Sequence, residues 1–223
     1  NKDREVVVYA NTSARVKAQA DWMVTSGTAV DVVRYLHGKG KKIIWAPDKY
    51  LGDFVQRQTG ADMLMWNGSC IVHEEFKAQE LSELVSRTSD VEVLAHPEST
   101  KGVLEQADFV GSTTALIDYA KGSKSKNLIV ATDKGIFYKM AQAAPNKNLI
   151  AAPTSGESAT CKSCAACPWM SLNNLISLKE SITNENSKIE VSPAIVKEAR
   201  KPIERLLEFA SDSKQVVFGN NDA

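Results

Sequence analysis

The chain has 223 residues, 43% of them hydrophobic and 24% charged, and its 27 basic side chains balance its 27 acidic ones. A chain of this length and composition can bury its own apolar core, which excludes a disordered, collagen-like or coiled-coil protein. The balanced charge gives no overall field that would attract nucleic acid or an anionic membrane surface. We therefore expect neither nucleic acid nor membrane as a partner.

The apolar runs of the sequence are short. The run at residues 149–152, among the longest, is far below the roughly 20 residues of a transmembrane helix, so a soluble, cytoplasmic protein is expected. The chain opens at Asn1 without a methionine and passes almost at once into the apolar run 5–9. We interpret this start as a piece of a longer polypeptide.

Short apolar runs alternate with longer amphipathic ones along the whole chain. This alternation predicts an α/β fold of repeated strand–helix units around parallel sheets. The predicted strands are residues 5–9, 22–24, 42–45, 63–66, 91–95, 108–111, 128–132, 148–151 and 189–191.

The clearest predicted helix spans residues 73–86. Its apolar stripe consists of Phe76, Leu81, Leu84 and Val85. Further on, the irregular stretch 152–168 predicts a loop, and amphipathic helices are expected at 170–182 and 193–211.

Unusual polar residues follow six of the first seven predicted strands, in the segments YANTSA, TSGTA, NGSC, HPEST, GSTT and TDKG. Ligands bind open α/β sheets at the carboxyl ends of the strands. Small and hydroxylated residues there leave backbone N–H groups free at helix starts, which suits carboxylate or phosphate. Each segment alone is an ordinary helix cap, but the repetition favours a binding site.

Three of the four cysteines form the run Cys161-x-x-Cys164-x-x-Cys167, which is followed by proline. Such spacing is typical of a metal centre, in which Cys70 would be the fourth ligand of an iron–sulfur cluster or a zinc site. The alternative is a redox thiol pair formed by Cys161 and Cys164.

Two histidines lie beside these features. His73 follows Cys70 by three positions, and His96 is followed closely by Glu98 on one strand-end loop. A histidine and a glutamate together could bind a carboxylate and move protons, although a single histidine is more often a core or surface residue. Likewise, Tyr9 is either a packing residue or a phenol that faces a pocket beside the amide of Asn11.

Eight segments, taken in order, resemble the quinolinate synthase family, closest to its proteobacterial branch. They are YANTSARVKAQAD, TSGTAV, IIWAPDKYLG, GSCIVHEEF, HPES, GSTT, ATDKGIFYKM and TCKSCAACPWM. The resemblance implies three similar three-layer α/β/α domains around a pseudo-threefold axis, of which two are present here. On this basis residues 1–69 are the second domain, 70–166 the third, and 167–223 a C-terminal helical segment that packs on the missing first domain.

The resemblance also implies an enzyme of de novo NAD biosynthesis. Such an enzyme condenses iminoaspartate with dihydroxyacetone phosphate to quinolinate, releasing phosphate and water, and L-aspartate oxidase supplies the iminoaspartate. A 4Fe-4S cluster on three cysteines is implied, with one ligand expected upstream of this chain. We therefore expect this chain alone to be inactive. The alternative function is a non-catalytic iron–sulfur, zinc-binding or thiol redox-sensing protein.

Carried over to this sequence, the family's motifs give a set of site residues. Cys70 and Cys167 match cluster ligands, whereas Cys161 and Cys164 match a redox pair. The resemblance assigns proton transfer to Glu98, with Tyr9 as the second choice. It places His73 on the cluster side of the cavity. The implied substrate-binding residues are Tyr9, Ala10, Asn11, Ser26, His96, Pro97, Glu98 and Thr113.

Overall fold

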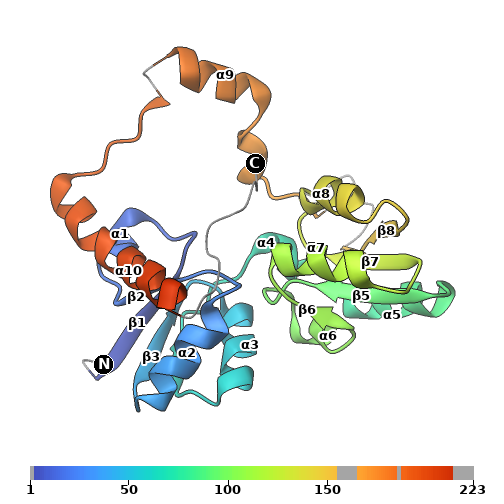
Figure 1. The fold of residues 1–223 in the computed structure, drawn as a ribbon, viewed down its shortest axis with the longest axis horizontal. Coiled ribbons are helices and arrows are strands. Elements are labelled where there is room, and N and C mark those ends of the chain that lie inside the picture. Colours follow the sequence, from blue (N-terminus) through green and yellow to red (C-terminus); the bar gives the residue numbers. More distant parts are fainter. Residues whose placement is uncertain (1–2, 155–164, 185–186, 213–223) are drawn as a thin grey trace. The chain divides into compact units, whose positions relative to one another are not determined.

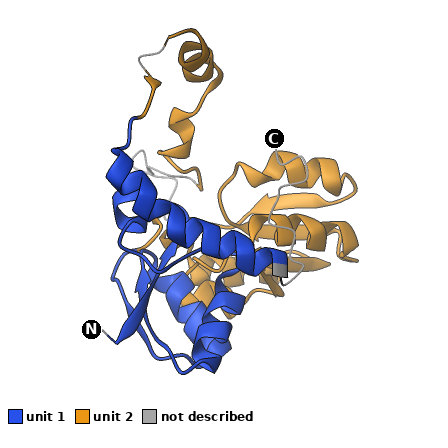
Figure 2. Ribbon diagram, turned by 60° about the vertical axis from the view of Figure 1, so that its left-hand side comes forward, with its two compact units in different colours: residues 1–68, 190–223 blue, residues 69–189 orange. Residues whose placement is uncertain are grey.

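The computed structural model describes residues 3–154, 165–184 and 187–212. The chain divides into two compact units, which Figure 2 shows in blue and orange. Unit 1 comprises residues 1–68 and 190–223, and unit 2 comprises residues 69–189. Each unit is built around its own four-stranded sheet.

Unit 1 has a parallel sheet with the strand order β2-β1-β3-β4 (Figure 1). Its strands are β1 (Arg4–Tyr9), β2 (Trp22–Val24), β3 (Lys42–Ala46) and β4 (Met63–Met65). Its helices are α1 (Ala14–Lys17), α2 (Ala29–Gly38), α3 (Lys49–Thr59) and α10 (Pro193–Asp212). Val7, Ile43 and Trp45 are fully buried in its core, as expected for a parallel sheet with covered strands.

The C-terminal helix α10 packs on the sheet of unit 1, against β2 and α1. Leu206 is 1% exposed within the apolar core of this unit. The ring of Phe209 makes edge-on contacts with Trp22 and Tyr35. Because Arg205 also donates a hydrogen bond to the carbonyl of Asp21, the helix is tied to unit 1 by both apolar and polar contacts.

Truncation of Leu206 tests how firmly α10 belongs to unit 1. Leu206→Ala removes a fully buried side chain, and such changes lower the free energy of unfolding by about 2–5 kcal/mol. Urea denaturation followed by tryptophan fluorescence measures the loss. Leu207→Ala is the matched control, since the neighbouring Leu207 is 41% exposed. Equal effects of the two substitutions would contradict the packing of α10 described above.

Unit 2 has a second parallel sheet, with the strand order β6-β5-β7-β8. Its strands are β5 (Val91–Ala95), β6 (Phe109–Val110), β7 (Asn127–Ala131) and β8 (Asn148–Ala151). Its helices are α4 (Ile71–Glu74), α5 (Ala78–Arg87), α6 (Lys101–Leu104), α7 (Thr113–Gly122), α8 (Ile136–Ala143), the 3-10 turn η1 (Met170–Leu172) and α9 (Leu175–Thr183).

The two units repeat the same design. In unit 1 the carboxylate of Asp21 accepts a hydrogen bond from the amide of Val6 at 2.8 Å. In unit 2 the carboxylate of Asp108 accepts one from Val93 at 2.7 Å. Each aspartate lies just before the edge strand, β2 or β6, that follows the central strand β1 or β5. The α/β class with repeated α/β/α domains and parallel sheets is therefore confirmed.

Three predicted elements differ from the structure. The helix predicted over 170–182 is interrupted after η1, because the side chain of Asn174 caps the separate helix α9 by accepting from the amides of Ile176 and Ser177. Residues 189–191 form no strand, because they join neither described sheet and Ile189 is 88% exposed. The single helix predicted over 73–86 is two helices, α4 and α5, with a break in between. At the break Phe76 forms a β-bridge with Thr154, and the amide of Lys77 bonds the carbonyl of Pro153. These tertiary contacts take the backbone groups that a continuous helix would use.

No helix within the described ranges is long and apolar enough to cross a bilayer. The division into 1–69, 70–166 and 167–223, a missing first domain and a pseudo-threefold axis stay predictions.

Candidate active site

The centre of the candidate site lies in unit 2, where α4 begins. Cys70 directly precedes this short helix and is half-buried. His73 lies on the helix three residues later, and its side chain is 7% exposed. The first helical turn therefore brings the sulfur and the imidazole to the same region, as i and i+3 neighbours on a helix do.

Two further side chains join this pair from the carboxyl end of β5. Glu98 Oε2 lies 3.1 Å from His73 Nδ1 and 3.6 Å from His96 Nδ1. The two imidazole rings stack, with 4.8 Å between their centroids. The ligand atoms of Cys70, His73 and Glu98 lie within 4.8 Å of one another. This buried sulfur, nitrogen and oxygen group could hold a metal ion.

Burial and neighbouring charge set the protonation of the three titratable groups. Burial by itself lowers the pKa of His73. The interactions of the imidazole with Cys70 and with the Glu98 carboxylate favour its protonated form more strongly, and the pKa is raised to about 9. Burial and the charge of His73 lower the pKa of His96 to about 4. Burial raises the pKa of Glu98, yet the two imidazoles hold it below its ordinary value. At neutral pH the site therefore holds a His73 cation, a Glu98 carboxylate and a neutral His96.

Two buried polar atoms in this group have unused hydrogen-bonding capacity. Glu98 Oε1 and His73 Nδ1 have no hydrogen-bond partner in the described part of the chain. Nδ1 is within ion-pair distance of Glu98 Oε2. Buried polar atoms are nearly always paired, so such exceptions indicate a ligand, ion or water. The unpaired carboxylate oxygen of Glu98 is therefore able to accept a hydrogen bond from a ligand or a water.

Sequence analysis did not single out Thr132, which follows β7 directly. Its hydroxyl lies 3.0 Å from His73 Nε2, and the residue is 2% exposed. The hydroxyl fixes the orientation of the His73 ring on the side away from Glu98. The segment TDKG was predicted as a polar strand end, but nothing in the sequence pointed to a contact with a histidine 59 residues away.

Removal of the Thr132 hydroxyl should weaken this site. Thr132→Val keeps the shape of the side chain but leaves His73 Nε2 buried without a partner, which costs about 1–3 kcal/mol. Hydrogen exchange of the β5 and β7 amides measures the local loss of stability, and imidazole ¹⁵N shifts report the change at His73. Thr114→Val is the control, because Thr114 is exposed. Unchanged ¹⁵N shifts of His73 in Thr132→Val would contradict the hydrogen bond.

Cys167 is also held at the carboxyl end of β7. Its thiol is free and half-buried, and its amide donates a 2.7 Å hydrogen bond to Asp133 Oδ2. Thr132 and Asp133 are consecutive, so one strand end contacts both the helix that follows Cys70 and the loop that carries Cys167. Cys161 and Cys164 lie outside the described residues.

The remaining predicted residues of unit 2 differ in their surroundings. Pro97 is buried between His96 and Glu98. Thr113 is the first residue of α7 and is exposed, outside the buried group of His73, His96 and Glu98.

Four predicted site residues belong to unit 1. Tyr9 is the last residue of β1, Ala10 and Asn11 follow it, and Ser26 lies two residues after β2. They occupy the positions that His96, Pro97, Glu98 and Thr113 hold in unit 2, each 87 residues later in the sequence. Their convergence with the residues of unit 2 on one cavity stays a prediction.

Lys17, which sequence analysis did not single out, holds the loop after β1. Its ammonium donates hydrogen bonds to the carbonyls of Ala10, at 2.7 Å, and Thr12. Partial burial lowers the pKa of Lys17. The hydroxyl of Thr12 in turn donates a hydrogen bond to the carbonyl of Tyr9 at 2.9 Å. The backbone carbonyls of this loop are therefore held by the side chains of Lys17 and Thr12.

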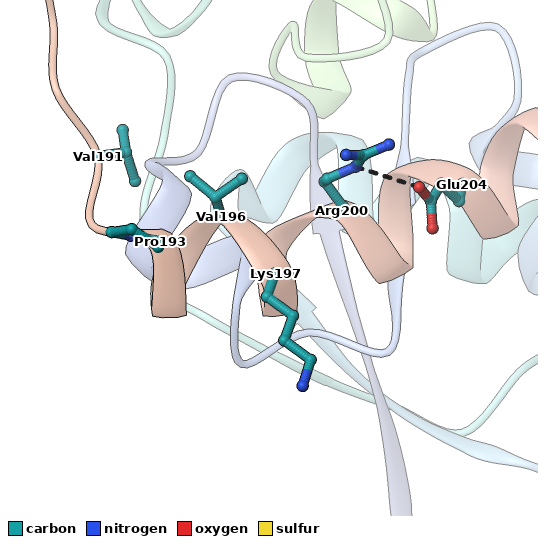
Figure 3. A pocket seen from close by; sticks show the side chains of 6 residues that line it. All are labelled: Val191, Pro193, Val196, Lys197, Arg200 and Glu204. Atoms are coloured by element: carbon teal, nitrogen blue, oxygen red, sulfur yellow. Dashed lines mark hydrogen bonds and ion pairs between the residues drawn. The ribbon is translucent and has the colours of Figure 1, made fainter.

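A hollow is found at α10 in unit 1. It is lined by Val191, Pro193, Val196, Lys197, Arg200 and Glu204 (Figure 3). Figure 3 shows Arg200 pairing with Glu204, at 3.2 Å between Nε and Oε1. No predicted site residue lines it, so we assign it no role in the chemistry.

Residues 1–208 match one known protein family, NadA, the quinolinate synthetase A protein. The chain belongs to this family. The match covers both sheets and every described residue of the candidate site, and it confirms the resemblance found in the eight sequence segments. A quinolinate synthetase A protein acts in the formation of quinolinate for NAD synthesis.

The residues of this family member fit a cluster of iron and sulfide. Soft thiolates are the ligands that such clusters take, and the described residues offer two cysteine sulfurs, those of Cys70 and Cys167. Both are half-buried. The end of β7 contacts Cys167 directly, through the amide bond to Asp133, and contacts His73, three residues after Cys70, through Thr132. Beside Cys70, Glu98 Oε1 has no hydrogen-bond partner among the described residues.

Proposed function

We propose that this protein is a quinolinate synthase that condenses iminoaspartate with dihydroxyacetone phosphate, releasing phosphate and water. The family match supports the product. The observation that carries the proposal is the buried group of Cys70, His73 and Glu98, with one carboxylate oxygen left unpaired. A metal-assisted condensation and dehydration needs a ligand for the metal and a group that transfers protons. Cys70 would supply the first, and the pair of His73 and Glu98 the second.

Cys70 and Cys167 would hold a 4Fe-4S cluster, with a third cysteine supplied from upstream. When bound, such a cluster supplies a Lewis acid. Cys161 and Cys164 would then be a redox pair rather than ligands. We assign the protein to the cytoplasm, with L-aspartate oxidase as the source of iminoaspartate and with no nucleic-acid or membrane partner.

Side chains of the protein transfer protons and stabilise charge. Glu98 takes or gives a proton at Oε1, because its other oxygen is occupied by His73. The imidazolium of His73 keeps Glu98 ionised and attracts the negative charge of a dicarboxylate substrate. Tyr9 is the second candidate for proton transfer, during ring closure.

The dicarboxylic substrate is bound by residues at equivalent strand ends of the two units. From unit 1 these are Tyr9, Ala10, Asn11 and Ser26, and from unit 2 they are His96, Pro97, Glu98 and Thr113. Their small, hydroxyl and amide groups are suited to carboxylate oxygens.

Anaerobic reconstitution of the whole natural polypeptide that contains this chain tests the proposal. The protein is loaded with iron and sulfide, the iron is counted, and quinolinate and phosphate are assayed with both substrates present. We expect the two products in equal amounts, and only when iron is bound. An iron-loaded protein that forms no quinolinate would refute the proposed activity.

A further inference from the structure

The carboxylate of Asp133 connects the end of β7 to the loop that carries Cys167. Its Oδ1 accepts a hydrogen bond from the amide of Gly135 at 2.7 Å, and its Oδ2 accepts one from the amide of Cys167 at 2.7 Å. The first bond is a local turn that fixes the orientation of the carboxylate. The second reaches 34 residues along the chain to the backbone of the cysteine itself.

A second hydrogen bond holds the same loop two residues earlier. The amide of Lys134 donates to the carbonyl of Ala165 at 2.7 Å. Ala165 is 2% exposed and has a φ of 59°, a left-handed conformation that alanine rarely adopts. A buried residue keeps such a conformation only where its surroundings determine it. The two bonds therefore fix the backbone that precedes the Cys167 thiol.

The equivalent strand end in unit 1 repeats the second of these bonds, while the carboxylate Oδ1 of Asp48 there accepts from the amide of Leu51 at the start of α3. There Asp48 and Lys49 follow β3, as Asp133 and Lys134 follow β7, and the amide of Lys49 donates to the carbonyl of Gly68 at 2.8 Å. Gly68 stands two positions before Cys70 in the sequence, just as Ala165 stands two positions before Cys167.

The contact in unit 1 is a close one. A Cβ on Gly68 would lie 2.5 Å from the carbonyl oxygen of Pro47, so only glycine allows the approach. In both units the lysine amide three positions after the third strand thus bonds the carbonyl two residues before a cysteine. The contact of the Asp133 carboxylate with the Cys167 amide adds a second bond in unit 2.

We propose that Asp133 and Lys134 are positioning residues that present Cys167 as a ligand. This inference rests on the proposed function, since it takes Cys167 as a ligand of the cluster. A thiol on a loop needs its backbone held before it can join a site of fixed geometry, and the groups that orient metal ligands strongly affect metal affinity. Because Thr132 beside them orients His73, one strand end arranges both sides of the site.

The test measures backbone protection and iron binding in the whole natural polypeptide. In Asp133→Ala the amide of Cys167 loses its acceptor, and we expect its hydrogen exchange to quicken about tenfold. The iron bound per chain should fall in the same variant. Asp118→Ala is the matched control, because the Asp118 carboxylate is exposed and bonds only the nearby Lys121 among the contacts described.

A second variant distinguishes the loss of this hydrogen bond from a general folding defect. Asp133→Asn keeps the size of the side chain but offers one acceptor oxygen for two amide donors. It should therefore also speed exchange at Cys167 or Gly135 and lower the iron content. Unchanged exchange of the β5 and β7 amides shows that unit 2 remains folded.

The outcomes separate this inference from the proposed function. If exchange at Cys167 or the bound iron is the same in Asp133→Ala and the native protein, the positioning role is wrong. If Cys167→Ser retains its iron, the ligand assignment under the proposed function fails instead, whatever Asp133→Ala does. Faster exchange together with iron loss, in both Asp133 variants and not in Asp118→Ala, supports the inference.

Discussion

Replacement of Glu98 by glutamine is expected to lower the turnover number about 100-fold or more while the iron stays bound, since a positioned acid or base contributes 10²–10⁴ in rate. Glutamine keeps the shape of the side chain but neither carries a charge nor exchanges a proton at the position of Oε1. It also removes the negative charge 3.1 Å from His73 Nδ1. The rate of quinolinate formation and the iron content of the purified variant check this result.

The control for this variant is Glu105→Gln. Glu105 lies just after α6, and its side chain is 60% exposed beside Lys101, so its replacement should leave turnover unchanged. Iron loss in Glu98→Gln would show that Glu98 holds the metal site together. Native turnover with iron bound would remove Glu98 from the proton-transfer role.

Cys167→Ser and Cys70→Ser are each expected to lose most of the bound iron, and with it all measurable quinolinate formation. A serine oxygen is a poor replacement for a thiolate on iron. Each cysteine follows a backbone segment whose carbonyl, at Gly68 or Ala165, accepts a hydrogen bond from the amide of Lys49 or Lys134. Iron counting and the visible absorption of the reconstituted whole polypeptide measure the loss.

Cys161→Ser is the matched control, because it changes a cysteine of the same run that the family resemblance assigns to a redox pair. Its iron content should equal that of the native protein. Loss of iron in both Cys161→Ser and Cys167→Ser would instead support a ferredoxin-like site built on the whole cysteine run.

Most of the fold could be predicted from the sequence. Eight of the nine predicted strands exist among the described residues, because consecutive apolar positions such as Leu128–Val130 mark strands that are covered on both faces. The strand predicted at 189–191 is wrong, because an apolar run forms a strand only where its backbone can pair with the edge of a sheet. The helix predicted at 73–86 failed because Phe76 and Lys77 bond to residues more than 70 positions away.

The sequence by itself determined which residues follow each strand. Since parallel strands direct their carboxyl ends to one edge of a sheet, this order was enough to select Cys70, His73, His96 and Glu98 as candidates. The resemblance to the quinolinate synthase family was found in the same segments.

Only the tertiary structure decided how these side chains are held. The contacts of Thr132 with His73 and of Asp133 with Cys167 join positions 59 and 34 residues apart. No local periodicity encodes such contacts, because they depend on the order of strands in the sheet and on the path of the returning loop. The long-range hydrogen bonds, rather than the motifs, fix the geometry in which the chemistry would occur.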